Sequence, residues 1–189
     1  DHAGVTLAGA QVVGGRLVFS GAGVRDALRR FCVLAESSPR NLSCQAVISV
    51  DQSLTPMLVV APCYTGSSAD PEELRALRSS PGIVEDRVRS PYGENRHYWK
   101  GHFVRELSDE LIDELLRRIL ALGRPPGEIL IESLHGAPKD GDSTDGAVGF
   151  RHAAFNVSPM GTCQHPALDE QHITCARETV AAIEPWSYS

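Results

Sequence analysis

The chain of 189 residues is 42% hydrophobic and 22% charged, with a formal net charge of −6. This length fits one domain that buries roughly 70% of the surface its unfolded form exposes, and the composition excludes a largely disordered chain. The net negative charge argues against a surface that binds nucleic acids or anionic membranes. The sequence contains no run of about 18 apolar residues, so no membrane span is predicted.

The first half of the chain alternates between apolar strand patterns and amphipathic helices. The run over 5–13 predicts a strand, and the spacing of apolar residues over 25–36 predicts a helix. Strict alternation over 42–50, a short polar turn and the apolar run 57–64 predict a β-hairpin. A capping box with proline at the first helical position predicts a helix over 70–78.

The second half continues in the same manner. Ser108 is a suitable N-cap for the clearest helix of the chain, which we expect to end at Gly123. The remaining predicted elements are strands over 83–90, 97–106, 128–134 and 147–158 and a last helix over 169–183.

The mixture of hairpins and helices predicts the α+β class. We expect a mainly antiparallel β-sheet of about six to seven strands with helices packed on one face. No interior linker divides the chain, so residues 1–189 are predicted to form a single domain.

The cysteines and the first residue bear on compartment and completeness. Five cysteines without a CxxC pair argue against a disulfide scaffold and against a structural zinc site. Cys44 and Cys63 lie in apolar strands and are expected to be buried, whereas a pair between Cys163 and Cys175 is left open. No signal-peptide pattern is present, which predicts a cytoplasmic protein. Since the chain starts with Asp1, we expect that an upstream part is missing.

Motifs that bind phosphates or metals are absent from the sequence. The glycines around Ala22 lack the lysine and the spacing of a phosphate loop and lack the full dinucleotide fingerprint. His97 and His102 are five residues apart, which puts them on opposite faces of a strand, so no metal site is predicted.

Polar residues in apolar strands are the first candidates for a site. His135 follows the strand over 128–134. It is either an edge residue with satisfied hydrogen bonds or a polar group at a pocket mouth that titrates near neutral pH. Arg151 and His152 are expected on opposite faces of the strand over 147–158, with Arg151 either a structural hydrogen-bonding residue or part of a site.

An aromatic cluster gives further candidates. Tyr98 and Lys100 share a face of the predicted strand and could line a site. Trp99 and Phe103 share the other face, where core packing is the simpler explanation.

Four segments form a recognisable series along the chain: residues 96–103 (RHYWKGHF) running into 106–110, residues 134–137 (LHGA), residues 147–155 with Arg151 at the centre, and residues 172–178 followed by Pro185. Together they resemble FAD-linked oxidases of the berberine-bridge-enzyme-like kind. The similarity covers nearly the whole chain, and the segments occur in the family's order.

Members of that family have an FAD-binding part and a substrate-binding part, and the second is an antiparallel sheet with helices behind it. This chain resembles only the second part. The resemblance implies FAD bound mainly by an FAD-binding domain of the same protein, so no cofactor-binding residue is assigned here. It also implies a small-molecule substrate whose alcohol or amine group loses a hydride to the flavin, with oxygen as the expected acceptor.

On this interpretation His135 is the candidate catalytic residue, and Tyr98, Lys100, Ser133 and Arg151 are candidates for substrate binding. The sequence departs from the family where some members carry an acidic base, because residues 156–158 contain no carboxylate. The identity of the base is therefore left open.

A second interpretation involves no redox chemistry. A chain without the flavin part could be a standalone flavin-free ligand-binding module, or a cofactor-independent isomerase or cyclase derived from that fold. In either case the sheet face that would meet a flavin domain is expected to be exposed and apolar, which would allow a homodimer.

Overall fold

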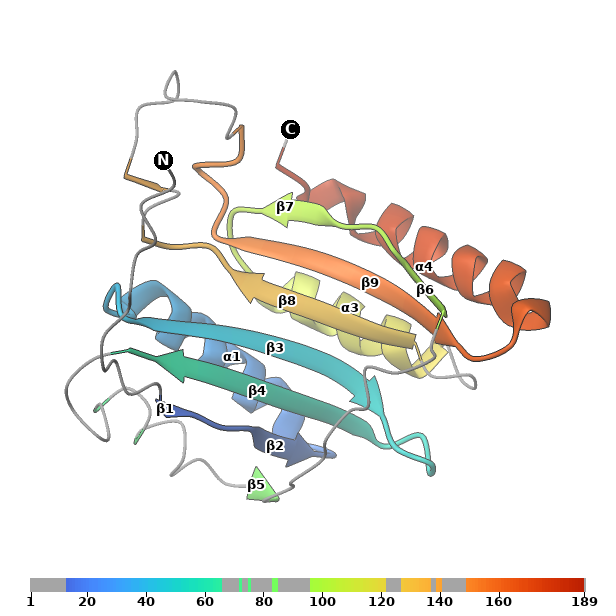
Figure 1. The fold of residues 1–189 in the computed structure, drawn as a ribbon, viewed down its shortest axis with the longest axis horizontal. Coiled ribbons are helices and arrows are strands. Elements are labelled where there is room, and N and C mark those ends of the chain that lie inside the picture. The colour runs from blue at the N-terminus through green and yellow to red at the C-terminus, as the bar shows by residue number, and fades with distance from the viewer. Residues whose placement is uncertain are drawn as a thin grey trace, which may run out of the picture.

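The computed structural model describes residues 13–65, 72, 75, 83–84, 96–121, 127–136, 139–140 and 149–188. In this part of the chain a single antiparallel sheet is backed by helices (Figure 1). None of the described helices is long and apolar enough to cross a membrane. The strands are β1 Val13–Gly14, β2 Leu17–Ser20, β3 Leu42–Val50, β4 Pro56–Tyr64, β5 Ile83–Val84, β6 Arg96–Trp99, β7 His102–Val104, β8 Gly127–Ser133 and β9 Phe155–Cys163, and the helices are α1 Gly23–Ser37, α3 Asp109–Ala121 and α4 Asp169–Ile183.

The sheet confirms the predicted α+β class. Its strand order is β5-β2-β4-β3-β8-β9-β6, while β1 also pairs with β4 and β7 with β9. Every described pairing is antiparallel. The nine described strands exceed the six to seven expected, because β2 was not predicted and the strand over 97–106 is divided in two.

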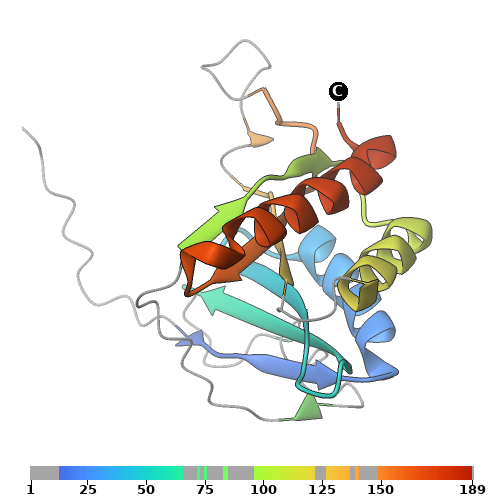
Figure 2. The same cartoon turned by 90° about the vertical axis from the view of Figure 1, so that its right-hand side faces the viewer.

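The three helices lie on the same face of the sheet, which Figure 2 shows nearly edge-on. Helix α1 packs behind β2 and β4, α3 packs behind β3 and β8, and α4 packs behind β9 and β6. Alternate residues of each strand point into the layer between sheet and helices and form the core. The largest fully buried side chains are Phe19, Leu28, Phe31, Leu42, Ile48, Leu58, Leu111, Ile112, Leu115, Ile119 and Phe155.

Local signals position the best-predicted elements. Ser108 Oγ accepts a hydrogen bond from the Leu111 N–H at 3.3 Å, which confirms the predicted N-cap of α3. The β3–β4 hairpin is closed by Asp51, whose Oδ1 accepts bonds from the N–H groups of Ser53 (2.8 Å) and Thr55 (2.9 Å). An aspartate side chain that accepts hydrogen bonds from backbone N–H groups two and four residues later favours a turn over a continued strand.

The strand predicted over 147–158 is wrong in its bounds. Residues 149–152 form a turn in which the Ala153 N–H donates to the Phe150 carbonyl at 2.9 Å, and the strand runs from Phe155 to Cys163. Arg151 and His152 therefore do not lie on opposite faces of a strand. The error arose because Pro159 and Gly161 have low strand propensity, whereas here both lie within the sheet.

Position 161 of the sheet requires glycine because helix α4 passes directly over it. A Cβ at this position would lie 2.7 Å from the carbonyl oxygen and 2.8 Å from the Cβ of His172. Only glycine allows such a close approach between strand and helix backbone.

The strand predicted over 97–106 is interrupted at Lys100 and Gly101, opposite Pro159 of β9. Pro159 has no N–H to donate to a neighbouring strand, and its carbonyl accepts a long bond of 3.4 Å from the Lys100 N–H. The interruption separates β6 from β7.

Other predictions fall partly or wholly outside the described residues. Of the strand expected over 5–13 only Val13 is described, and of the helix over 70–78 only residues 72 and 75, both helical. Of the strand over 83–90 only Ile83 and Val84 are described.

Three of the cysteines lie in strands, and Cys32 and Cys175 lie in helices α1 and α4. All five are free, and Cys44 is buried as predicted. The prediction for Cys63 is wrong, because its position in β4 faces away from the helices and leaves it exposed. Cys163 and Cys175 are not paired with each other.

Candidate functional site

The sheet face away from α1, α3 and α4 is called the open face here. No described helix covers it, as Figure 2 shows. Its residues alternate along each strand with those of the core. On the four central strands they include Gln45 and Val47 of β3, Met57 and Val59 of β4, Glu128, Leu130 and Glu132 of β8, and Asn156, Ser158 and Met160 of β9.

A polar row crosses the open face. Gln45, Glu132 and Asn156 are direct neighbours on β3, β8 and β9. The Asn156 side-chain amide donates to Glu132 Oε2 at 2.8 Å, and the Gln45 amide donates to Oε1 at 3.5 Å. Both carboxylate oxygens are thus contacted by neutral donors, which orient the carboxylate without neutralising its charge.

The same row continues to the edge of the sheet as aromatic side chains. Phe103 of β7 pairs with Asn156 and stacks on Phe150, with ring centres 4.3 Å apart and planes inclined by 8°. The prediction that Phe103 packs in the core is therefore wrong, because its strand position faces away from the helices.

A second carboxyl group lies on the open face at the other end of β8. Burial raises the pKa of Glu128, while the charges of His97 and Arg16 act in the opposite direction. Across the sheet from Glu128, Met160 of β9 is its direct neighbour, and Trp99 of β6 is the next residue beyond Met160. The prediction that Trp99 belongs to the core is also wrong: β6 lies at the sheet edge, and the indole is 63% exposed.

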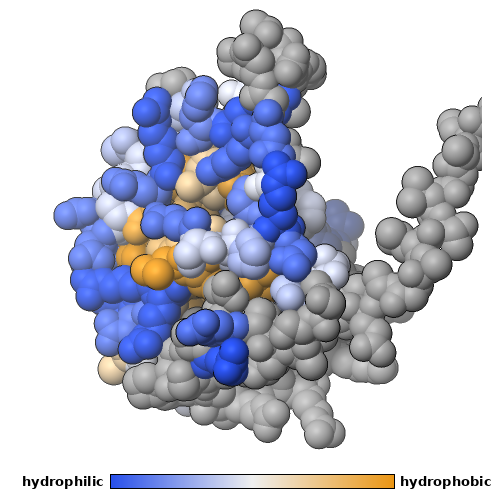
Figure 3. All heavy atoms as spheres, turned by 90° about the vertical axis from the view of Figure 1, so that its left-hand side faces the viewer, coloured by the Kyte–Doolittle hydropathy of each residue, from blue (hydrophilic) through white to orange (hydrophobic). Residues whose placement is uncertain are grey.

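Three predicted site residues lie where β8 ends and β9 begins. The Leu134 N–H donates to the Ala154 carbonyl at 2.8 Å, which joins the segment of His135 to the segment of Arg151. The side chains of His135 and Arg151 are both half-buried. Ser133 Oγ already donates to the Cys44 carbonyl at 2.9 Å. Figure 3, a view of the left-hand side of Figure 1, shows hydrophobic residues surrounded by hydrophilic ones.

Tyr98 and Lys100 lie elsewhere. The Tyr98 hydroxyl accepts a hydrogen bond from Arg177 Nε of α4 at 3.1 Å, so this ring is on the helix side of the sheet. Lys100 is exposed between β6 and β7. Tyr98 pairs with Gly161 and Ser133 with Phe155, six residues apart on β9, which is roughly 20 Å. The structure therefore does not bring the five predicted residues to one place, and their roles stay predictions.

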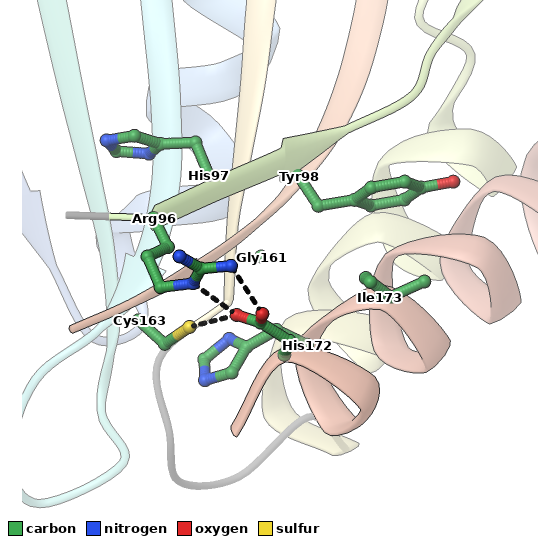
Figure 4. A pocket seen from close by; sticks show the side chains of 8 residues that line it. Arg96, His97, Tyr98, Gly161, Cys163, His172 and Ile173 are labelled. Carbon is green, nitrogen blue, oxygen red and sulfur yellow. Dashed lines mark hydrogen bonds and ion pairs between the residues drawn. The ribbon is translucent and has the colours of Figure 1, made fainter. Parts of the chain in front are cut away.

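A pocket of about 120 Å³ lies on the helix side between β6, β9 and α4 (Figure 4). Arg96 Nε and Nη2 donate to the two Asp169 oxygens at 2.8 and 2.6 Å, and the Cys163 thiol donates to Oδ1 at 3.4 Å. The guanidinium lowers the pKa of Asp169, while burial and the neighbouring carboxylate raise that of the Cys163 thiol.

His172 completes this pocket. It is 4% exposed, and its Nε2 has no hydrogen-bond partner within the described part of the chain. Burial lowers the pKa of the imidazole, which favours the neutral ring. Arg96 and Asp169 bond to each other, and the raised pKa keeps the Cys163 thiol protonated. The residues of this pocket therefore join α4 to the sheet and include no activated nucleophile.

Among the described residues, no cluster of three or more His, Cys, Asp or Glu side chains has the geometry to hold a metal ion.

The Glu132–Asn156 contact was not predicted from the sequence, although both residues lie in segments that contain predicted site residues. Alternation along each strand could have placed each side chain on the outward face. The pairing of β8 with β9 in this register could not be read from either segment alone.

The fold so described is similar to one part of several solved structures. No protein-family model matches the sequence, and no curated protein matches it. Among solved structures, berberine bridge enzyme from Eschscholzia californica matches with a TM-score of 0.72 and 12% identity, over 94% of this chain and 41% of that protein. For 6-hydroxy-D-nicotine oxidase from Arthrobacter nicotinovorans the values are 0.71, 16%, 95% and 44%.

A third similar structure is GilR, an oxidoreductase that catalyses the terminal step of gilvocarcin biosynthesis, in complex with pregilvocarcin. Its TM-score is 0.65 at 20% identity, over 89% of this chain and 41% of GilR. The resemblance inferred from the sequence is thereby confirmed for the fold, and this chain spans less than half the length of the structures that it matches.

Proposed function

We propose that this chain is the substrate-binding part of an FAD-dependent oxidoreductase that oxidises an alcohol or amine group of a small molecule. The main support is the extent of the structural match, which covers 94% of this chain but 41% of berberine bridge enzyme. That proportion is expected for one part of a two-part enzyme. FAD would be bound mainly by another domain of the same protein, as the sequence resemblance implies.

The open face is compatible with a flat ring system lying against it. Val47, Val59 and Leu130 form a small apolar centre on three neighbouring strands, and no described helix lies over them. Sites for aromatic ligands are mostly apolar and contain a few precisely placed polar groups. On the open face the polar row of Gln45, Glu132 and Asn156 supplies such groups. When bound, the flavin would take the hydride from the substrate and pass its electrons to oxygen.

Glu132 is our candidate for the group that accepts the substrate proton. Hydride loss from an alcohol carbon leaves a hydroxyl proton that must go to a base, and a carboxylate within reach can take it. Glu132 is suitable because its described partners are neutral amides rather than arginine or lysine. A fixed cation would lower the basicity of the carboxylate and occupy it.

His135 and Arg151, at the adjoining end of β8 and β9, are proposed to orient the substrate. Both are half-buried, and the Leu134–Ala154 hydrogen bond holds their segments together. Tyr98, Lys100 and Ser133 have no part in this proposal, since they lie apart or are already bonded to other groups.

The proposal is tested on the complete protein that contains this chain. The purified protein should show the visible absorption bands of flavin, which should bleach on anaerobic addition of an oxidisable alcohol or amine and return with oxygen. His135→Ala should lower turnover without lowering the unfolding temperature. A colourless protein that binds or isomerises a small molecule would instead support the flavin-free alternative.

A further inference from the structure

Glu132 is held from both sides by residues of the neighbouring strands. Asn156 on β9 contacts one carboxylate oxygen and Gln45 on β3 contacts the other, so each oxygen has its own donor. The Asn156 bond, at 2.8 Å, is of full strength, whereas the Gln45 contact, at 3.5 Å, is at the limit for a hydrogen bond.

Two properties of these donors suit them to orient a base. An amide neither takes up nor releases a proton near neutral pH, so neither residue competes with Glu132 for the substrate proton. Both donors extend from strands paired with β8, which are rigid supports compared with a loop. A free glutamate side chain rotates about three bonds, and fixing it in advance removes that entropic cost from the reaction.

We infer that Asn156 and Gln45 are positioning residues that hold the Glu132 carboxylate in its reactive orientation, with Asn156 the stronger of the two. This inference rests on the proposed function. Neither amide needs to touch the substrate, because both act through Glu132.

Kinetics of the flavin-loaded protein test the inference. Asn156→Ala should lower kcat about 10- to 100-fold and change KM by less than about threefold, since a misplaced base affects the chemical step more than binding. Gln45→Ala should have a smaller effect in the same direction. Ser43→Ala, two residues from Gln45 on the same strand and face, is the matched control and should leave kcat within about twofold.

Two further variants separate positioning from a structural role. Asn156→Asp has almost the same shape but replaces the donor with a second carboxylate, so it should lose at least as much activity as Asn156→Ala. Asn156→Gln keeps a donor and should recover part of kcat. Full activity in Asn156→Asp, or an equal loss in Asn156→Gln and Asn156→Ala, would overturn the inference.

The contact itself is read independently of activity. In the full chain, Glu132→Gln should shift the side-chain amide resonances of Asn156 and, more weakly, of Gln45, while leaving those of Asn41 in place. Unshifted Asn156 resonances would refute the contact. If the wild-type protein reduces its flavin and the Asn156 variants have the same kcat as wild type, only this inference is refuted. If the wild-type protein contains no flavin, the proposed function is refuted, and the inference with it.

Discussion

The two faces of the sheet are made by the same strands and differ in almost every physical respect. On the helix side, Leu42, Ile48 and Phe155 are fully buried against α1, α3 and α4. On the open side, the same strands present Gln45 and Asn156 around a carboxylate. The helix side therefore accounts for folding, whereas the polar groups of the open side contribute little to the core, and it is to them that the proposed function assigns the chemistry.

The largest contrast is expected in thiol reactivity. Cys44 and Cys63 lie on adjacent strands, but Cys44 is 3% exposed on the helix side, and burial raises the pKa of its thiol to about 12. At pH 8 only about one in 10⁴ such thiols is ionised, so exposed Cys63 should react at least ~100-fold faster with a disulfide reagent. Peptide mapping of the native protein measures both rates, and comparable labelling of Cys44 would contradict the assigned faces.

Side-chain deletion should give the next largest difference. Phe31 of α1 is fully buried, with its ring centre 6.0 Å from that of Phe155, so Phe31→Ala should lower the free energy of unfolding by about 3–5 kcal/mol. Trp99→Ala on the open face should cost less than about 1 kcal/mol. Urea unfolding measures both, and equal losses would indicate that Trp99 is packed.

A single methyl group tests the contact between sheet and α4. Gly161→Ala places a Cβ 2.7 Å from the His172 carbonyl oxygen and should destabilise the protein by about 1–3 kcal/mol. Gly149→Ala is the control, because a Cβ there meets no atom of the described residues within 4 Å, and it should stay within about 0.5 kcal/mol of wild type. Indistinguishable melting temperatures for the two variants would rule out the close approach.

The smallest effect concerns ion pairs on the outer surface of the helix layer. Arg25 and Arg29 of α1 donate to Asp113 and Asp109 of α3 and lower the pKa of both carboxyls. Because the folded pKa is lowered, the stabilisation is present above the ordinary value of 3.8 and is lost as pH falls below it.

Replacing both arginines with glutamine should therefore flatten the loss of stability between about pH 5 and pH 2. Unfolding by urea across that range measures the slope. Arg30→Gln, on the same helix, should leave the slope unchanged, and a double variant as steep as wild type would show that these exposed pairs contribute nothing.

Elements defined by local pattern could be predicted from the sequence, and elements defined by distant contacts could not. The helix over 169–183 and the strand over 42–50 match the structure, because their periodicity and turn residues lie within the segment. Strand β9 was misplaced because Gly161 makes sense only beside the backbone of α4.

The site divides in the same way. His135 and Arg151 were selected from their own segments, and the structure holds those segments together at one end of β8. Glu132 gained its importance only from Asn156, which lies 24 residues away and is brought beside it by the β8–β9 register. A register is fixed by the whole sheet, so no single segment could reveal it.

The central claim, that the open face carries the chemistry, is tested most directly by the rate of flavin reduction in a rapid-mixing experiment. Glu132→Gln should reduce that rate at least ~100-fold while leaving the flavin spectrum and the unfolding free energy unchanged, because it keeps the shape and removes the base. Glu178→Gln, exposed on α4 behind the sheet, should react as fast as wild type. An undiminished rate in Glu132→Gln would contradict the claim.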